Sequence, residues 1–320
     1  MKKNNNKGII LLLVTVLVCT MALAGCGEVQ LSETINIATL NGPTGMGMAK
    51  LMENPDNYNV TTYQSPDEIV AKIVSGEVDL ATVPSNLAAV LYNKTKGKIV
   101  SVSAVTLGVL YVLENGKTIS DISQLKGKTI VASGKGGTPE YVLEKILKEN
   151  DLKLGKDVKV EWLANHTEVV GKLLSKEGTI AMVPEPFVTV AKAKGGQGIN
   201  QVLDMNKEWK TSTGQDLPMG VLIAQNSFVN DRKADLEIFL ADYSESVKFV
   251  NKEPAEAATL IAKHGLVGDE KIAEKAIPNC NIVMYQKGES TELQKSFLDI
   301  LYKMNPQAVG GKLPGEEFYY

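Results

Sequence analysis

Few side chains in this 320-residue chain combine the types and spacings that catalysis requires. Its only histidines are His166 and His264, and neither is spaced with a second ligand as metal-binding motifs require. Cys280 could pair with His264 as nucleophile and base, but no partner pattern surrounds them. Glu77 and Asp79 are a close carboxylate pair at the start of a predicted strand, where solvated turn charges are expected. The sequence therefore predicts no catalytic residue, no metal site and no cofactor.

Two glycine-rich segments invite comparison with phosphate-binding loops. Residues 42–47 lack the Gly-Lys-Ser/Thr ending that would hold a nucleotide and magnesium. Residues 133–137 lack the Gly-x-Gly-x-x-Gly spacing of dinucleotide sites, because position 139 is proline. Nucleotide binding is therefore not expected at either segment.

Charge narrows the classes of ligand and partner. The formal net charge of the chain is −3, from 34 basic and 37 acidic residues, and it would become about −6 without the three lysines of residues 1–25. Nucleic acid is therefore not an expected partner. The single arginine, Arg232, lies in the polar stretch 230–233. Because this arginine lies outside the predicted ligand cleft, no guanidinium group can bind an anionic ligand there through two hydrogen bonds. Such a ligand would depend on helix N-termini, hydroxyl groups and Lys135.

The first 25 residues are predicted to be a signal peptide. Lysines without an acid precede an apolar run over residues 8–24 and a small-residue exit. The exit resembles the bacterial lipobox, in which Cys26 is acylated and becomes the new N-terminus. A transmembrane anchor is the alternative, because the run lies at the short limit for crossing a bilayer. Residues 26–33 are interpreted as a lipidated tether, so we expect an extracytoplasmic protein held at the cell membrane by lipid.

Beyond the tether, short β-rich runs alternate with helical patterns, which is typical of βαβ units around mainly parallel sheets. Two long apolar runs, residues 99–113 and 219–224, are interpreted as crossovers between two lobes. The chain is therefore predicted to be α/β. Lobe 1 would comprise residues 34–111 plus 222–320, and lobe 2 residues 112–221.

Local signals predict several individual elements. Residues 65–68 are a capping box that begins a helix ending at Gly76. Residues 41–47 are predicted to be a turn, followed by a short helix over residues 48–53. From Lys233 onward the pattern is helical, and these helices are expected to pack on lobe 1.

Four loops at the ends of predicted strands form the candidate site: residues 41–47, 84–86, 133–138 and 184–186. In open α/β sheets, ligands lie beyond the carboxyl ends of strands, where helix N-termini present unpaired N–H groups. The alternative is that glycine and proline only make tight turns there. Because all four loops follow the ends of predicted strands, they favour a ligand cleft between two lobes.

Acidic and aromatic side chains near these loops have two interpretations. Glu140 and Glu185 would compensate the dipoles of neighbouring helices, or would accept a hydrogen bond from an amine or ring N–H of the ligand. The aromatic residues placed to cover a flat ligand, although core packing is the commoner role for each, are Tyr63, Tyr111, Tyr141, Trp162 and Phe187.

Together these segments resemble the periplasmic-binding-protein-like solute receptors of ABC importers, in the nitrate, taurine, sulfonate and thiamine-precursor group. The resemblance runs from residue 35 to about residue 266. It is carried by SGEVDLA (75–81), VPSN (83–86), LKGK (125–128), GTPEY (137–141) and VPEPF (183–187). It implies the type II periplasmic-binding-protein fold, in which two lobes joined by two crossover strands close on the ligand about a hinge.

The resemblance also implies a set of ligand contacts: Asn41, Gly42, Thr44, Gly45, Ser85, Asn86, Gly137, Thr138 and Glu185. The implied ligand is a small molecule, either sulfonate-like or a small heterocycle such as a thiamine precursor. The implied partners are an ABC permease and its ATPase, to which a monomeric receptor delivers the ligand. An extracellular sensor and an enzyme like the pyrimidine-synthesising or menaquinone-pathway relatives are the alternatives on the same fold.

Overall fold

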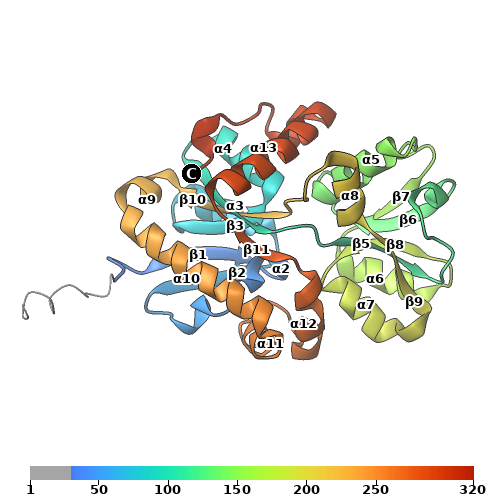
Figure 1. The fold of residues 1–320 in the computed structure, drawn as a ribbon, viewed down its shortest axis with the longest axis horizontal. Helices are drawn as coiled ribbons and strands as arrows, with labels where there is room; N and C mark the ends of the chain where they lie inside the picture. Colours follow the sequence, from blue (N-terminus) through green and yellow to red (C-terminus); the bar gives the residue numbers. More distant parts are fainter. Residues whose placement is uncertain (1–29) are drawn as a thin grey trace, which may run out of the picture.

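The computed structural model describes residues 30–320, which form two lobes, each built around one β-sheet (Figure 1). The predicted signal peptide, the Cys26 lipidation site and the first residues of the tether lie outside the described residues. Within residues 30–320, no helix combines the length and the apolarity of a membrane span.

The sheet of lobe 1 has six strands in the order β11-β4-β10-β3-β1-β2. Its strands are β1 (Ile35–Leu40), β2 (Tyr58–Tyr63), β3 (Leu80–Pro84), β4 (Ile99–Thr106), β10 (Gly220–Gln225) and β11 (Ile282–Tyr285). β1 pairs in parallel with β2 and β3, whereas β10 runs antiparallel to β3 and β4. β1 to β4 therefore end at the edge where β10 begins.

The sheet of lobe 2 has five strands in the order β7-β6-β8-β5-β9. They are β5 (Leu110–Asn115), β6 (Thr129–Ser133), β7 (Lys159–Leu163), β8 (Ile180–Pro184) and β9 (Ile199–Asp204). β6 is parallel to β7 and β8, and β5 is antiparallel to β8 and β9. β6 to β9 therefore end at the edge where β5 begins.

Helices pack around both sheets (Figure 1). They are α2 (Pro43–Met46), α3 (Pro66–Ser75), α4 (Ser85–Thr95), α5 (Thr138–Glu149), α6 (His166–Ser175), α7 (Phe187–Gly195), α8 (Met205–Thr213), α9 (Asn226–Asp231), α10 (Lys233–Lys252), α11 (Pro254–Lys263), α12 (Glu270–Ala276) and α13 (Lys287–Met304). As predicted, α10 and α11 bury their apolar residues with the strands of lobe 1.

Two local predictions had opposite outcomes. The capping box of α3 is confirmed, because Ser65 accepts from the N–H of Asp67 while Glu68 accepts from the N–H of Ser65. The predicted helix over residues 48–53 is wrong. The helix starts earlier, at Pro43, and residues 51–53 form only a 3-10 turn. Proline suits the first position of a helix, where its missing N–H has no partner to lose.

Two crossovers join the carboxyl edges of the sheets. Residues 107–109 lead from the end of β4 to the start of β5, and residues 214–219 lead from α8 back to β10. The two edges therefore face each other. The predicted lobe boundaries need a small correction, because Tyr111 pairs with Val183 in the second sheet and Val221 pairs with Val83 in the first. The apolar run over residues 99–113 is continuous through the first crossover, so the sequence carries no boundary signal there. The second predicted crossover run, residues 219–224, is strand β10, and the crossover lies just before it.

Candidate functional site

The candidate site lies where the carboxyl edges of the two sheets face each other. α4 begins directly after β3, and α5 begins after the loop that follows β6. Neither helix has an N-cap side chain that bonds to its first-turn N–H groups. The N–H of Ser85 donates to the carbonyl of Met219 at 3.2 Å and that of Glu140 to the carbonyl of Gly137 at 3.1 Å, so the remaining first-turn N–H groups are those available for an acceptor atom of a ligand.

Asn41 and Gly42 begin the first loop, directly after β1. The N–H of Asn41 donates to the carbonyl of Tyr63 at 2.9 Å, and the N–H of Gly42 donates to the carbonyl of Leu266 at 2.8 Å. Gly42 has a φ of 83°, which glycine adopts without strain. The side-chain oxygen of Asn41 is buried and has no hydrogen-bond partner. Asn41 is therefore the residue of this pair with an unused polar group.

Thr44 and Gly45 lie within the short helix α2 of lobe 1. Thr44 contacts the start of β10, where a Cβ on Gly220 would lie 2.9 Å from Thr44 Cγ2. A Cβ on Gly45 would lie 2.1 Å from the carbonyl oxygen of Leu40. Close packing therefore accounts for the glycine at position 45, and its contact with a ligand stays a prediction.

Asn86 and Thr138 meet across the two lobes. Thr138 Oγ1 donates to Asn86 Oδ1 at 3.1 Å, and the Asn86 amide donates to the carbonyl of Ala308 at 3.3 Å. Gly137, just before Thr138, is the N-cap of α5. Ser85, the first residue of α4, is buried and its hydroxyl has no partner. Because an unpaired buried hydroxyl is destabilising, a ligand atom that bonded Ser85 would gain affinity.

Glu185 is buried at the start of α7. Its carboxylate accepts from the backbone N–H and from the hydroxyl of Thr189, both at 3.1 Å. Burial raises the pKa of Glu185, and the hydrogen bonds from Thr189 oppose that shift. These contacts favour the dipole-compensating interpretation. The neighbouring Pro186 lies across the lobe interface from Gly42, since a Cβ on Gly42 would lie 3.9 Å from Pro186 Cδ.

His166 is a candidate site residue that the sequence analysis missed. It is the first residue of α6, after β7, and its Nδ1 lies 2.6 Å from Ser133 Oγ at the end of β6. Its ring centroid lies 5.0 Å from that of Phe187, after β8. Its position directly after a predicted strand could have indicated this role, but the sequence argument considered His166 only as a metal ligand.

Asn206 in α8 was also missed. Its side-chain oxygen, Oδ1, is buried without a hydrogen-bond partner. A Cβ on Gly108 would lie only 1.7 Å from this Oδ1, so Asn206 lies directly against the first crossover. The absence of a side chain at Gly108 allows this contact.

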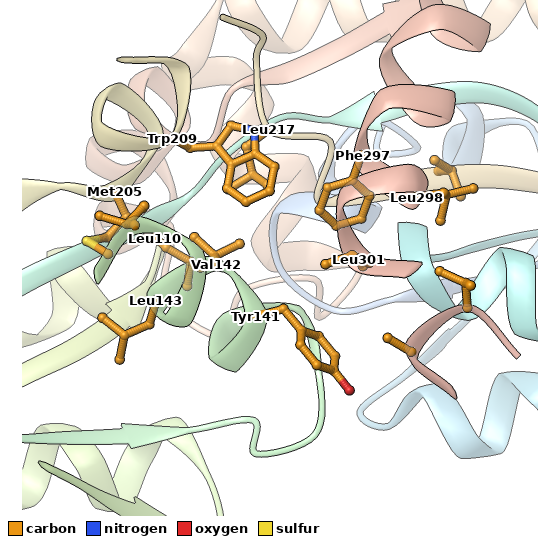
Figure 2. Close-up of a cluster of buried hydrophobic side chains, with 14 of the residues drawn as sticks. Leu110, Tyr141, Val142, Leu143, Met205, Trp209, Leu217, Phe297, Leu298 and Leu301 are labelled. Carbon is orange, nitrogen blue, oxygen red and sulfur yellow. The ribbon is translucent and has the colours of Figure 1, made fainter. Parts of the chain in front are cut away.

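An apolar seam joins the lobes beside the site (Figure 2). We define it by residues that belong to one buried cluster, and these are Tyr141, Val142 and Trp209 of lobe 2 and Leu217 of the second crossover, with Phe297, Leu298 and Leu301 of lobe 1. The ring centroids of Trp209 and Phe297 are 5.7 Å apart. Asn305 donates to the hydroxyl of Tyr141 at 3.2 Å. For Tyr141 the core-packing interpretation is therefore favoured over ligand stacking.

The site carries little that could act as a catalyst. Among the described residues, no cluster of three or more histidine, cysteine or acidic side chains could hold a metal ion. Ser133 and His166 are the pair most like a nucleophile and base, but burial lowers the pKa of His166 to about 4. No carboxylate among residues 30–320 bonds to His166 and orients it as a base.

A separate cavity of about 380 Å³ lies between α7 and α12. Val190 and Ala193 line it from lobe 2, and Val267 and Ile272 line it from lobe 1. None of the predicted ligand contacts lines this cavity.

Comparison with protein families gives one family match. The model of the family described as menaquinone biosynthesis matches residues 46–290. A curated relative, YtlA of Bacillus subtilis (strain 168), is provisionally named a binding protein and is 23% identical over 186 residues. The match covers 54% of this chain and 55% of YtlA, so the chain spans about half the length of that relative.

Several solved structures with the same fold are named as ABC-transporter proteins. A crystal structure of an ABC transporter from Parabacteroides distasonis is 25% identical, with a TM-score of 0.78 over 90% of this chain and 99% of that chain. The periplasmic aliphatic sulphonate binding protein SsuA from Escherichia coli is 17% identical, with a TM-score of 0.71 over 89% and 94%.

The alkanesulfonate-binding protein SsuA from Xanthomonas axonopodis pv. citri, bound to MOPS, is 11% identical, with a TM-score of 0.68 over 91% and 99%. At such identities the two SsuA proteins show the fold alone. The predicted type II periplasmic-binding-protein fold is confirmed, as is the resemblance to ABC-importer binding proteins.

Proposed function

We propose a function from one premise: this chain belongs to the menaquinone biosynthesis family, whose model matches residues 46–290. The protein captures a small molecule between its two lobes and delivers it to an ABC importer. The observation that carries the proposal is the hydrogen bond from Thr138 to Asn86, which joins two strand-end loops on opposite lobes.

Capture works through closure of the lobes. A ligand that touches both lobes binds the closed arrangement more tightly than an open one, and it shifts the population by that difference in affinity. Ser85 and Asn41 support the location of the ligand, because each has a buried oxygen without a protein partner. The other predicted contacts stand as proposals with them.

Delivery requires the protein to stay near its permease. Residues 1–25 serve as the signal peptide, Cys26 carries the lipid, and residues 26–33 form the tether. One acyl chain binds a membrane only marginally, so stable anchoring needs more than one chain.

The permease and its ATPase are the proposed partners, and the receptor acts as a monomer. An importer role predicts uptake by proteoliposomes that contain the permease; a sensor would bind its ligand without supporting uptake.

Thermal unfolding of the purified protein tests the proposal. The panel comprises taurine, alkane sulfonates, nitrate and thiamine pyrimidines. A ligand at a hundredfold excess over Kd adds about 2.7 kcal/mol to stability and raises the Tm measurably. Ser85→Leu and Thr138→Leu should lose that shift while staying folded. Thr259→Leu, on the exposed surface of α11, is the matched control. Undiminished affinity in both site variants would refute this location.

An enzyme is the second candidate, because the matching family is described as menaquinone biosynthesis and Ser133 bonds to His166. Mass spectrometry of the ligand after incubation separates the two functions. A receptor returns the compound unchanged, whereas an enzyme returns a product in amounts that exceed the protein.

A further inference from the structure

We propose that His166, supported by Ser133 and Phe187, forms the solute-contacting wall of lobe 2, and that the solute is an uncharged molecule with a planar polar group. This inference rests on the proposed function and specifies the class of ligand. The three side chains come from three neighbouring junctions at the edge of the lobe 2 sheet, after β7, β6 and β8.

The position of His166 leaves one ring nitrogen for a ligand. Ser133 is buried with only 3% of its surface exposed, and its hydroxyl lies 2.6 Å from Nδ1 of the half-buried His166. Nε2 forms no hydrogen bond with any residue in the range 30–320. If the serine hydroxyl donates to Nδ1, Nε2 carries a proton and donates; in the other tautomer Nε2 accepts. Either tautomer offers a ligand one directed hydrogen bond.

Phe187 adds a flat surface beside this nitrogen. Its ring lies 5.0 Å from the imidazole ring, at an interplanar angle of 46°. Two tilted rings at this separation form a wall against which a planar group can pack. Phe187 is only partly buried, so part of its surface is available for contact.

The charges near the wall favour an uncharged solute. Among the strand-end loops of residues 30–320, the only basic side chain is the exposed Lys135. Burial lowers the pKa of His166, so its ring is neutral at pH 7. Glu185 places a buried carboxyl group between β8 and α7, close to Phe187 in the chain.

Helix N-termini alone would have to stabilise an anion here. α4 and α5 offer unpaired N–H groups, but a buried ion without a paired counter-charge keeps most of its desolvation penalty. The same N–H groups suit a carbonyl or hydroxyl oxygen of a neutral molecule, which loses far less on leaving water.

The test uses the purified protein and the small-molecule fraction of a bacterial extract. Wild type, His166→Ala, His166→Gln and Phe187→Leu are incubated with this fraction and freed of unbound compounds. Mass spectrometry then identifies what each retains. The matched control is His264→Ala, because His264 lies in lobe 1 and bonds to Glu53. Unchanged circular dichroism of each variant establishes that it is folded.

We expect wild type and His264→Ala to retain the same uncharged compound with a planar polar group. His166→Ala should retain at least about tenfold less, which corresponds to the loss of one directed hydrogen bond. His166→Gln, which keeps a polar end, should retain more than His166→Ala. Phe187→Leu should also bind less.

Two results would overturn the inference and leave the proposed function standing: retention of a sulfonate or another compact anion, or equal retention by wild type and His166→Ala. A wild-type protein that retains no compound would instead overturn the proposed function.

Discussion

At the scale of residues, the candidate site is marked by polar groups without partners and not by charge. Ser85 and Asn41 each bury an oxygen that no protein group bonds. His166 is held by Ser133 in a setting that keeps its ring neutral. Glu185, the one buried acid on the site loops, uses its carboxylate to bond Thr189. Such a surface suits recognition by hydrogen bonds.

His166→Gln is expected to remove an acid-dependent loss of stability. Burial lowers the pKa of His166 from 6.5 to about 4, so below pH 6.5 the unfolded state binds a proton that the folded state excludes. Wild type should therefore lose roughly 2–3 kcal/mol relative to the variant between pH 7 and pH 4.5. Urea unfolding at both values measures this. A difference between the two proteins that stays constant with pH would contradict the burial of His166.

At the scale of elements, the end of the chain completes the lobe 1 sheet. Tyr319 forms a parallel bridge with Ser101, and the N–H of Tyr320 donates to the carbonyl of Ser101 at 2.9 Å. Phe318 is fully buried, with its ring 5.2 Å from that of Tyr92. The sequence there has no periodic pattern, so only the structure identifies this contact.

Phe318→Ala should lower the free energy of unfolding by about 3–5 kcal/mol, because it removes a fully buried aromatic ring and leaves a cavity. Leu313→Ala is the control, since Leu313 lies in the same C-terminal segment but is 38% exposed. Chemical denaturation compares the two. Equal, small effects would show that the C-terminal segment does not dock in solution.

The capping box of α3 offers a second test at this scale. Ser65→Ala should lower the stability by about 1 kcal/mol, because the N–H of Asp67 loses its acceptor. Glu68→Gln should have a smaller effect, since glutamine can also accept from the N–H of Ser65. The difference in urea midpoint between the two variants measures the strength of the serine cap.

At the scale of the whole molecule, the apolar seam couples the lobes next to the crossovers. Trp209 of lobe 2 and Phe297 of lobe 1 are both almost fully buried. Leu217, in the second crossover, belongs to the same cluster. Opening the lobes would expose part of this surface, which favours the closed arrangement even before a ligand binds.

In a Trp162→Phe background, Trp209 is the only tryptophan. There, Phe297→Ala should shift the tryptophan fluorescence emission of the folded protein to longer wavelength. Loss of the facing ring, 5.7 Å away, admits water to the indole. Phe239→Ala is the matched control, because Phe239 is equally buried but lies within lobe 1. It should reduce stability without changing the native emission. Emission that Phe297→Ala leaves unaltered would argue against the seam.

The pattern of residues predicted the fold well, whereas the ligand contacts stay predictions. Strand and helix periodicities indicated two α/β lobes, because alternation and capping are local properties. The lobe boundaries were misplaced by a few residues, because the apolar run over residues 99–113 passes through the first crossover without a break and the run over residues 219–224 is β10, not the crossover before it. His166 was overlooked because its role depends on Ser133 and Phe187, which are far from it in sequence but follow adjacent strands.

The amino-acid sequence alone established the fold class, the loops at the strand ends and the scarcity of cationic groups near them. These follow from periodicity, from turn chemistry and from composition, none of which requires contacts between distant residues. The three-dimensional structure was needed to show that Thr138 meets Asn86, that Ser85 lacks a partner and that Trp209 packs on Phe297. Those pairings depend on how two crossovers orient the lobes, and long-range packing sets that orientation.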